Sequence, residues 1–75
     1  MTREIPIRGD TIRLGQLLKL AGVVDSGSEV KMLLGAEAAL VNGEPEIRRG
    51  RQLRPGDRVR LAGNELLVTG ADPHP

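Results

Sequence analysis

Residues 14–34 read LGQLLKLAGVVDSGSEVKMLL, and two helix patterns with a break between them decide how this chain folds. In the first pattern, apolar residues recur at helical spacing and form one stripe, at Leu14, Leu17, Leu18 and Ala21. Gln16 and Lys19 fall on the opposite, exposed side. Gly22 suits the left-handed residue that follows the end of a helix. We therefore predict a short helix that ends at Ala21.

The second pattern begins at Ser26. Ser26 to Glu29 fits a capping box, in which the serine hydroxyl accepts a hydrogen bond from a backbone amide and Glu29 reaches back. The helix is predicted to run to about Leu34 and to end at Gly35. It should bury Val30, Leu33 and Leu34. Because only a few residues join the two helices, we expect them to form a tight pair.

The N-terminal residues predict a short strand at the edge of a sheet. Ile5 and Ile7 alternate with charged residues, which is the period of a half-buried strand. Pro6 has no N–H group to donate to a neighbouring strand, and this favours an edge position. Gly9-Asp10 then predicts a turn.

A second run of extended segments follows the helices. Four strands are expected, at residues 38–41, 44–47, 58–61 and 65–69. Asn42-Gly43 predicts a hairpin between the first two, because a type I′ turn needs positive φ at both central positions. Pro45 favours another edge strand, and Gly63-Asn64 predicts the last turn. Val59 and Leu61 should face the core.

Helices followed by strands indicate an α+β domain, with two short helices packed on one face of a small, mostly antiparallel sheet. The 75 residues are too few for a second core, so we predict a single domain over residues 1–70 and a disordered tail over residues 71–75. The sequence has no Phe, Tyr, Trp or Cys. Aliphatic side chains must therefore build the core, and a reducing compartment is favoured.

Few residues could support catalysis. The single histidine, His74, falls in the predicted tail, and neither Ser26 nor Ser28 has a base nearby to activate it. Glu44 and Glu46 share one face of a predicted strand, which we interpret as a solvated face rather than a catalytic carboxylate pair. Nucleotide-binding loops and metal-ligand spacings are absent from the sequence. We expect a non-enzymatic protein without a cofactor, a metal ion or a small-molecule substrate.

Positive charge is concentrated in residues 48–60, RRGRQLRPGDRVR. This segment holds six arginines and one aspartate, a net charge of +5, whereas the rest of the chain holds five bases and nine acids. A guanidinium group stays charged at cellular pH and matches the geometry of phosphate oxygens. The sequence therefore predicts a surface for a polyanion. Its main phosphate contacts are expected at Arg48, Arg49 and Arg51, with Arg54 in support.

Other residues could reach the same phosphates. Lys31 lies on the exposed side of the second helix, and the amides of Gly27 and Ser28 open that helix, where a phosphate is attracted. Asp25 and Glu29 stand beside them and would repel it. Without aromatic rings for stacking unpaired bases, phosphate contacts and shape must dominate RNA binding.

Two other binding modes compete with this interpretation. A DNA-binding helix-turn-helix is disfavoured, because the second helix offers only Lys31 and Ser28 on its exposed side for reading bases. The alternative that remains open is a protein-interaction module, which would dock a basic strand face carrying Arg58 and Arg60 on an acidic partner.

Several short motifs resemble, in their order and spacing, the RNA-binding domain named after ribosomal protein S-four, which is also called the alpha-L motif. The resemblance covers about residues 12 to 61. It is carried by the helix pair with Arg13-Leu14, Ser26, Leu33-Leu34, Val41-Asn42-Gly43 and Gly56-Asp57-Arg58-Val59. Residues 14–22, LGQLLKLAG, and 42–51, NGEPEIRRGR, are more similar still to small stand-alone bacterial members, the YbcJ/YaaA-like proteins.

The resemblance implies a non-enzymatic domain that binds structured RNA, ribosomal or transfer RNA, with ribosome assembly as its setting. The family's usual RNA surface implies contacts at Arg13, Ser26, Gly27, Ser28 and Lys31. We expect a monomer in the cytoplasm, because the N-terminus lacks the apolar run of a signal peptide and no segment could span a bilayer.

The sequence also departs from the family's pattern. Gly15 stands where Asp is common, Gly27 where Arg often follows the serine, and Lys31 where Arg is common. The positive charge that the family carries on its second helix is therefore reduced here. We expect the arginines of residues 48–51 to replace it.

Overall fold

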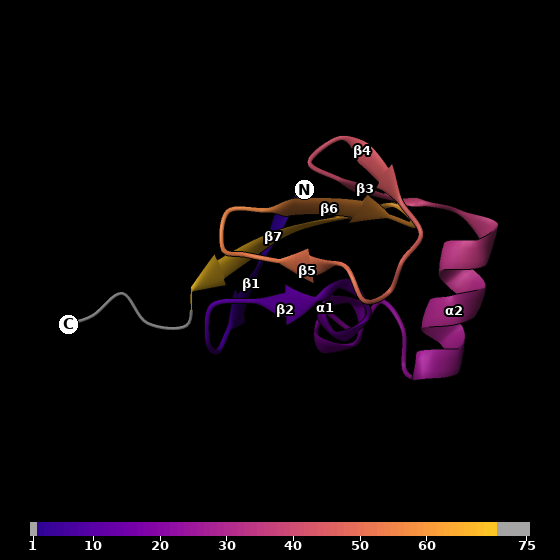
Figure 1. Ribbon diagram of the computed structural model, residues 1–75, viewed down its shortest axis with the longest axis horizontal. Coiled ribbons are helices and arrows are strands. Elements are labelled where there is room, and N and C mark those ends of the chain that lie inside the picture. Colours follow the sequence, from indigo (N-terminus) through magenta and orange to yellow (C-terminus); the bar gives the residue numbers. More distant parts are fainter. Residues whose placement is uncertain (1, 71–75) are drawn as a thin grey trace.

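The structure, a computed structural model, describes residues 2–70 and has the expected α+β architecture (Figure 1). A five-stranded sheet has the order β1-β7-β6-β3-β4. Its strands are β1 (Thr2–Ile7), β3 (Ala39–Val41), β4 (Glu44–Glu46), β6 (Arg58–Leu61) and β7 (Asn64–Gly70). The helices are α1 (Leu14–Leu20) and α2 (Gly27–Ala36), and two short strands, β2 (Ile12–Arg13) and β5 (Gln52–Leu53), form a separate pair. The predicted tail, residues 71–75, lies outside the described residues.

The pairing in the main sheet is mostly antiparallel, as predicted, with one exception. β1 runs parallel to β7, whereas β7, β6, β3 and β4 pair antiparallel in turn. β1 and β4 are the two edges of the sheet. They carry Pro6 and Pro45, so both prolines occupy the edge positions that their missing N–H groups predicted.

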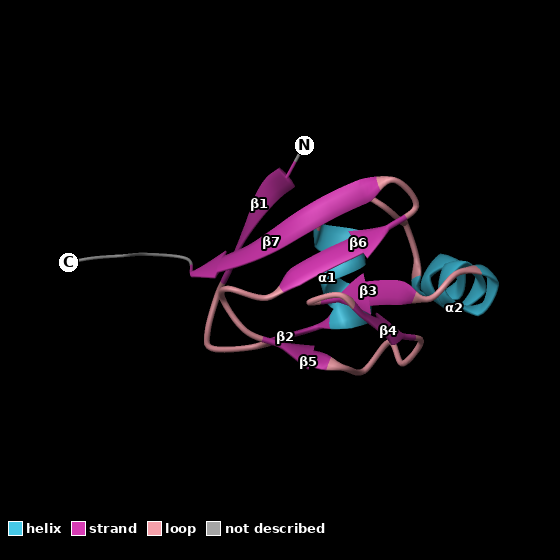
Figure 2. Cartoon of the chain, turned by 90° about the horizontal axis from the view of Figure 1, so that it is seen from above, coloured by secondary structure: helices cyan, strands magenta, loops and turns pink. Residues whose placement is uncertain are grey.

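The two helices have different places relative to the sheet. α1 lies under its inner face and buries Leu14, Leu17 and Leu18 completely, whereas α2 stands beside one end of the sheet (Figures 1 and 2). α2 joins the same core through Val30 and Leu34. The helices contact each other as predicted, but only α1 covers the sheet. Within residues 2–70, neither helix is long and apolar enough to cross a membrane.

Local hydrogen bonds fix the ends of both helices. Gly22 is left-handed, with φ at 77°, and the N–H groups of Gly22 and Val23 donate to Lys19 and Leu18, which closes α1 as predicted. At the start of α2, the Ser26 hydroxyl accepts a hydrogen bond from the Glu29 amide at 3.3 Å. The Glu29 carboxylate reaches back one residue further than in a standard capping box, to the amide of Asp25.

The prediction that Gly35 ends the second helix is wrong. α2 continues through Ala36, and the chain becomes extended only at Glu37. A β-carbon placed on Gly35 would meet no other atom within 4 Å. Glycine inside a helix costs about 0.5–1 kcal/mol relative to alanine. The fold itself therefore does not require a glycine at this position.

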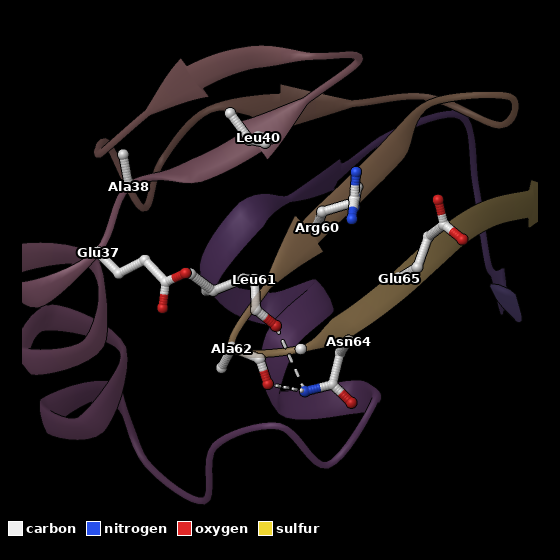
Figure 3. A pocket seen from close by; sticks show the side chains of 9 residues that line it. Glu37, Ala38, Leu40, Arg60, Leu61, Ala62, Asn64 and Glu65 are labelled. Atoms are coloured by element: carbon white, nitrogen blue, oxygen red, sulfur yellow. Dashed lines mark hydrogen bonds between the residues drawn. The ribbon is translucent and has the colours of Figure 1, made fainter. Parts of the chain in front are cut away.

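The two hairpin turns use left-handed residues. Asn42 and Gly43 have φ of 52° and 86°, which confirms the predicted type I′ turn. The last turn is formed by Ala62 and Gly63 rather than by Gly63 and Asn64. Asn64 instead begins β7 and donates its side-chain amide to the carbonyls of Leu61 and Ala62 (Figure 3).

The β2–β5 pair was not predicted. It places Ile12 opposite Leu53 and Arg13 opposite Gln52, so the arginine-rich segment crosses the start of α1. Leu53 is fully buried and anchors this crossing in the core. The arginine-rich segment was expected to be a loop. The β2–β5 pair instead holds it in place against the start of α1.

Glycine-to-alanine substitutions at two positions should have opposite effects on stability. Gly35→Ala should raise the free energy of unfolding by about 0.5–1 kcal/mol, because the open helical site accepts a methyl group. Gly43→Ala should lower it by about 1 kcal/mol or more, because φ is positive there. Urea denaturation of both variants measures the difference. A Gly35→Ala protein less stable than the parent would show that the helix is packed at this point.

Candidate nucleic-acid interface

The connection from β4 to β5 lies against the start of α1. The backbone N–H of Gly15 donates to the carbonyl of Arg49 at 2.9 Å, and that of Leu14 donates to Arg51 at 2.8 Å. A β-carbon on Gly15 would lie 3.3 Å from Cγ1 of Val30 and 3.4 Å from Cβ of Arg49. Glycine at position 15 therefore leaves the space that lets Arg49 approach the helix pair.

Arg49 links the starts of the two helices. Its backbone is bonded to Gly15 of α1, and its Nη1 lies 4.0 Å from the place of a β-carbon on Gly27, the first residue of α2. Within residues 2–70 its guanidinium group forms no hydrogen bond and no ion pair. The positive charge of Arg49 is thus available to a ligand at the N-terminus of α2.

More cations surround Arg49 on the side of α1. Arg49 lines a hollow of about 350 Å³ together with other cationic side chains. A hollow elsewhere on the protein is larger, at about 450 Å³, but does not bring several cations together. The lining of the smaller hollow includes Arg13, Gln16, Lys19, Gly27, Arg49 and Gly50. From the sequence, Gln16 and Lys19 were expected to lie on the exposed side of the first helix, but they were not predicted to contact a ligand. The spacing of three from Arg13 to Gln16, and again from Gln16 to Lys19, was the signal that all three share one face.

A second hollow lies on the other side of Arg49. It measures about 440 Å³ and is lined by Lys31, Leu34, Gly35, Ile47 and Arg49. Lys31 therefore shares a depression with Arg49. Arg49 forms part of the wall of both hollows.

Glu46 pairs with Arg48 and Arg51, the arginines on either side of Arg49 in the sequence. Its carboxylate accepts hydrogen bonds from Nε and Nη2 of Arg48, both at 3.0 Å, and from Nη1 of Arg51 at 3.1 Å. The backbone amide of Arg48 also donates to it. Glu46 is only 7% exposed, so the interpretation of this strand face as solvated is wrong for Glu46, although Glu44 is exposed.

The environment of Glu46 favours its charged form. The hydrogen bonds from the side chain and the backbone of Arg48, followed by that from Arg51, lower the pKa of Glu46 to about 2. The charges of Arg48 and Arg51 are offset by the same carboxylate. The Arg48 side chain nevertheless remains 74% exposed, whereas that of Arg51 is only 34% exposed.

The other predicted contacts are divided between two places. Ser26 caps α2 with its hydroxyl, Gly27 lines the first hollow, and Ser28 is exposed in the first turn of α2. These three residues lie on the side of Arg49. The β5–β6 connection, which begins with Arg54, lies on the opposite side of the molecule from α2 (Figure 1). The structure therefore does not bring Arg54 together with the others.

The outer strand face carries mixed charge. Arg60 on β6 stands opposite Glu65 on β7, at the rim of the hollow of about 450 Å³, to which Glu37 also contributes (Figure 3). A hydrogen bond from the Thr2 hydroxyl lowers the pKa of Glu65, and the positive charges of Arg60 and Arg58 lower it further. Two acids line this hollow beside one arginine, so it is a poorer site for a polyanion.

Cations at the starts of two helices, on an α+β fold with a β-hairpin after the second helix, are the features that the sequence resemblance implied for an RNA-binding domain. The profile of the S4 domain matches residues 5–69, and the chain belongs to this family. The predicted RNA-binding family is thus confirmed.

The chain is also similar, over most of its length, to a bacterial protein. The chain is 48% identical over 63 residues to a Bacillus subtilis (strain 168) protein described as probable ribosome maturation protein RlbA. The matched region covers 84% of this chain and 89% of the relative. The relative is therefore a small protein of the same kind, as the resemblance to small bacterial members implied.

The cluster of Glu46 with Arg48 and Arg51 should make the free energy of unfolding depend on pH in the acidic range. The folded pKa of about 2 lies below the ordinary value of 4.5, so the unfolded chain binds more protons between these values. Stability from this group should be fully present above about pH 4.5 and be lost as the pH falls towards 2. Glu46→Gln should flatten this part of the curve in urea denaturation from pH 2 to 6.

The matched control is Glu44→Gln, an exposed position on the same strand. It should keep the acid-dependent loss of stability. Glu65 also has a lowered pKa, so the Glu46→Gln protein should retain some dependence. A Glu46→Gln curve identical to that of the parent would contradict the role of the cluster.

Proposed function

We propose that this protein binds structured ribosomal RNA through phosphate contacts centred on Arg49 and catalyses no reaction on it. The observation that carries the proposal is the position of the Arg49 guanidinium group, between the starts of both helices and without a partner in residues 2–70. Phosphate oxygens are the natural ligand of such a group, because they match its charge and its fork of donors.

In this proposal Arg49, which lies in the β4–β5 connection, supplies the positive charge that members of the family often have on the second helix. The residue after the helix-two serine is Gly27, and Nη1 of Arg49 lies 4.0 Å from where its β-carbon would be. The guanidinium therefore occupies the space beside the first turn of α2. There it would meet the same phosphate as the backbone amides of Gly27 and Ser28.

The proposed contact surface extends from Arg49 along both helices. Arg13 and Lys19 add charge on the side of α1, and Lys31 adds charge on the side of α2. The remaining proposed contacts are Ser26, Gly27, Ser28, Arg48 and Arg51. We expect the phosphate contacts of Arg48 and Arg51 to be weaker than that of Arg49, because Glu46 offsets part of their charge. RNA would reach Arg54 only by extending past β5.

The name of the relative favours ribosomal RNA over transfer RNA, because that protein is described as a probable ribosome maturation protein. We infer that the present protein likewise acts on RNA during ribosome assembly, as a monomer in the cytoplasm. The competing function, docking of a basic strand face on an acidic protein, receives less support because Glu65 stands opposite Arg60 on that face.

Replacing Arg49 tests the proposal. Arg49→Gln should weaken binding to ribosomal RNA about ten-fold at low salt, since a charged hydrogen-bonded contact is worth about 1.5–3 kcal/mol. The slope of log affinity against log salt concentration should start near −3 to −4 for four or five contacts and become shallower by about 0.7–0.9. Filter binding over a salt series measures both quantities.

Two variants with the same loss of charge serve as controls. Arg48→Gln should have a smaller effect, because Glu46 already offsets that charge. Arg58→Gln, on the outer strand face, should leave the RNA affinity unchanged. If Arg58→Gln weakens binding and Arg49→Gln does not, the strand face is the interface and the proposal is overturned. In that case an acidic polypeptide should bind the strand face, and Arg58→Gln should weaken its binding.

A further inference from the structure

A depression beside the end of α2 combines an apolar floor with a cationic rim. Leu34 and Gly35 of α2 line it on one side, and Ile47 lines it from the β4–β5 connection. Lys31 and Arg49 add two positive charges to the same hollow of about 440 Å³. Figure 1 shows this connection passing alongside α2.

Two of these residues have no evident role in the fold. Ile47 is 67% exposed, although it is one of the few large apolar residues outside the core. Gly35 lies inside a helix, with a normal helical backbone and open space where a β-carbon would stand. A glycine at such a place leaves the helix backbone bare, which allows another molecule to approach closely.

We propose that this hollow receives one unpaired nucleotide of the bound RNA, an inference that rests on the proposed function. The base lies against Ile47 and the bare turn of α2 at Gly35. The phosphate of the same nucleotide lies between Lys31 and Arg49. The site thereby distinguishes RNA with an unpaired residue from a continuous duplex.

The chemistry of the hollow favours a nucleotide over a purely apolar partner. A nucleotide joins a flat face that prefers apolar contact to an anion, and this hollow pairs an apolar floor with two cations. Bases also stack on the plane of an arginine side chain, so the lack of aromatic residues does not prevent recognition of a base. A base inside a duplex is stacked on its neighbours and could not enter.

A second apolar hollow on α2 provides the contrast. It is lined by Val23, Val24, Met32, Leu33 and Ala36 together with Glu29. Its floor is similarly apolar, but its charged residue is an acid. A phosphate would be repelled there, so the two hollows differ in the sign of their charge.

Filling the hollow tests the inference without harming the fold. Gly35→Gln adds a good helix former into open space and should keep or raise the melting temperature. The probes are an RNA duplex and the same duplex with one unpaired adenosine. The parent protein should bind the second RNA roughly five-fold more tightly, the gain expected from burying about 40 Å² of apolar surface. Gly35→Gln should abolish this preference and leave the affinity for the plain duplex unchanged.

Matched substitutions complete the experiment. Ile47→Ala should also reduce the preference, whereas Met32→Ala, which removes a similarly exposed apolar side chain from the other hollow, should not. Ala36→Gln controls for the added side chain one position further along α2.

The outcomes separate this inference from the function on which it rests. A parent protein that binds both RNAs equally, with no effect of Gly35→Gln, overturns the nucleotide site and leaves RNA binding in place. An equal loss on both RNAs in Gly35→Gln also overturns it, because the contact would then be to the backbone. A parent protein that binds neither RNA overturns both proposals.

Discussion

The hydrogen bonds of the first backbone amides of α1 fix where the β4–β5 connection lies. α1 has no side-chain cap and no acidic residue in its first turn. The carbonyls of Arg49 and Arg51 accept those amide hydrogen bonds instead. A helix end without such partners would be costly. Because the cap comes from residues distant in sequence, the same contact that completes α1 carries the Arg49 side chain across to the start of α2.

Glu46 gives neighbouring arginines different properties. One carboxylate accepts hydrogen bonds from Arg48 and Arg51, and these bonds are stronger than bonds between neutral groups because both partners are charged. Arg49, between them in sequence, has its Nη1 beside Gly27 and remains unpaired within residues 2–70. A single acid thus holds the loop on both sides of Arg49 in the sequence. Within one short segment, two arginines are bonded to a carboxylate, and the one we propose as the phosphate contact is not.

Much of the fold followed from local sequence patterns. The apolar stripe of α1, the serine cap of α2 and the left-handed Asn42-Gly43 turn are set by residues within one helical or hairpin turn, so their geometry needs no distant partner. The β2–β5 pair could not be found in this way, because two-residue strands carry no periodicity. The end of α2 was misplaced because Gly35 permits a helix to stop without forcing it to do so.

By itself the sequence determined an α+β domain of the S4 family and a concentration of positive charge after the hairpin. Tertiary structure decided which of those charges are paired with a carboxylate and which have no partner within residues 2–70. Arg48, Arg49 and Arg51 are alike as sequence letters, and only the approach of Glu46 and the two helices distinguishes them. Side-chain charge is a property of each residue, whereas its availability depends on which neighbours the folded chain brings within hydrogen-bonding distance.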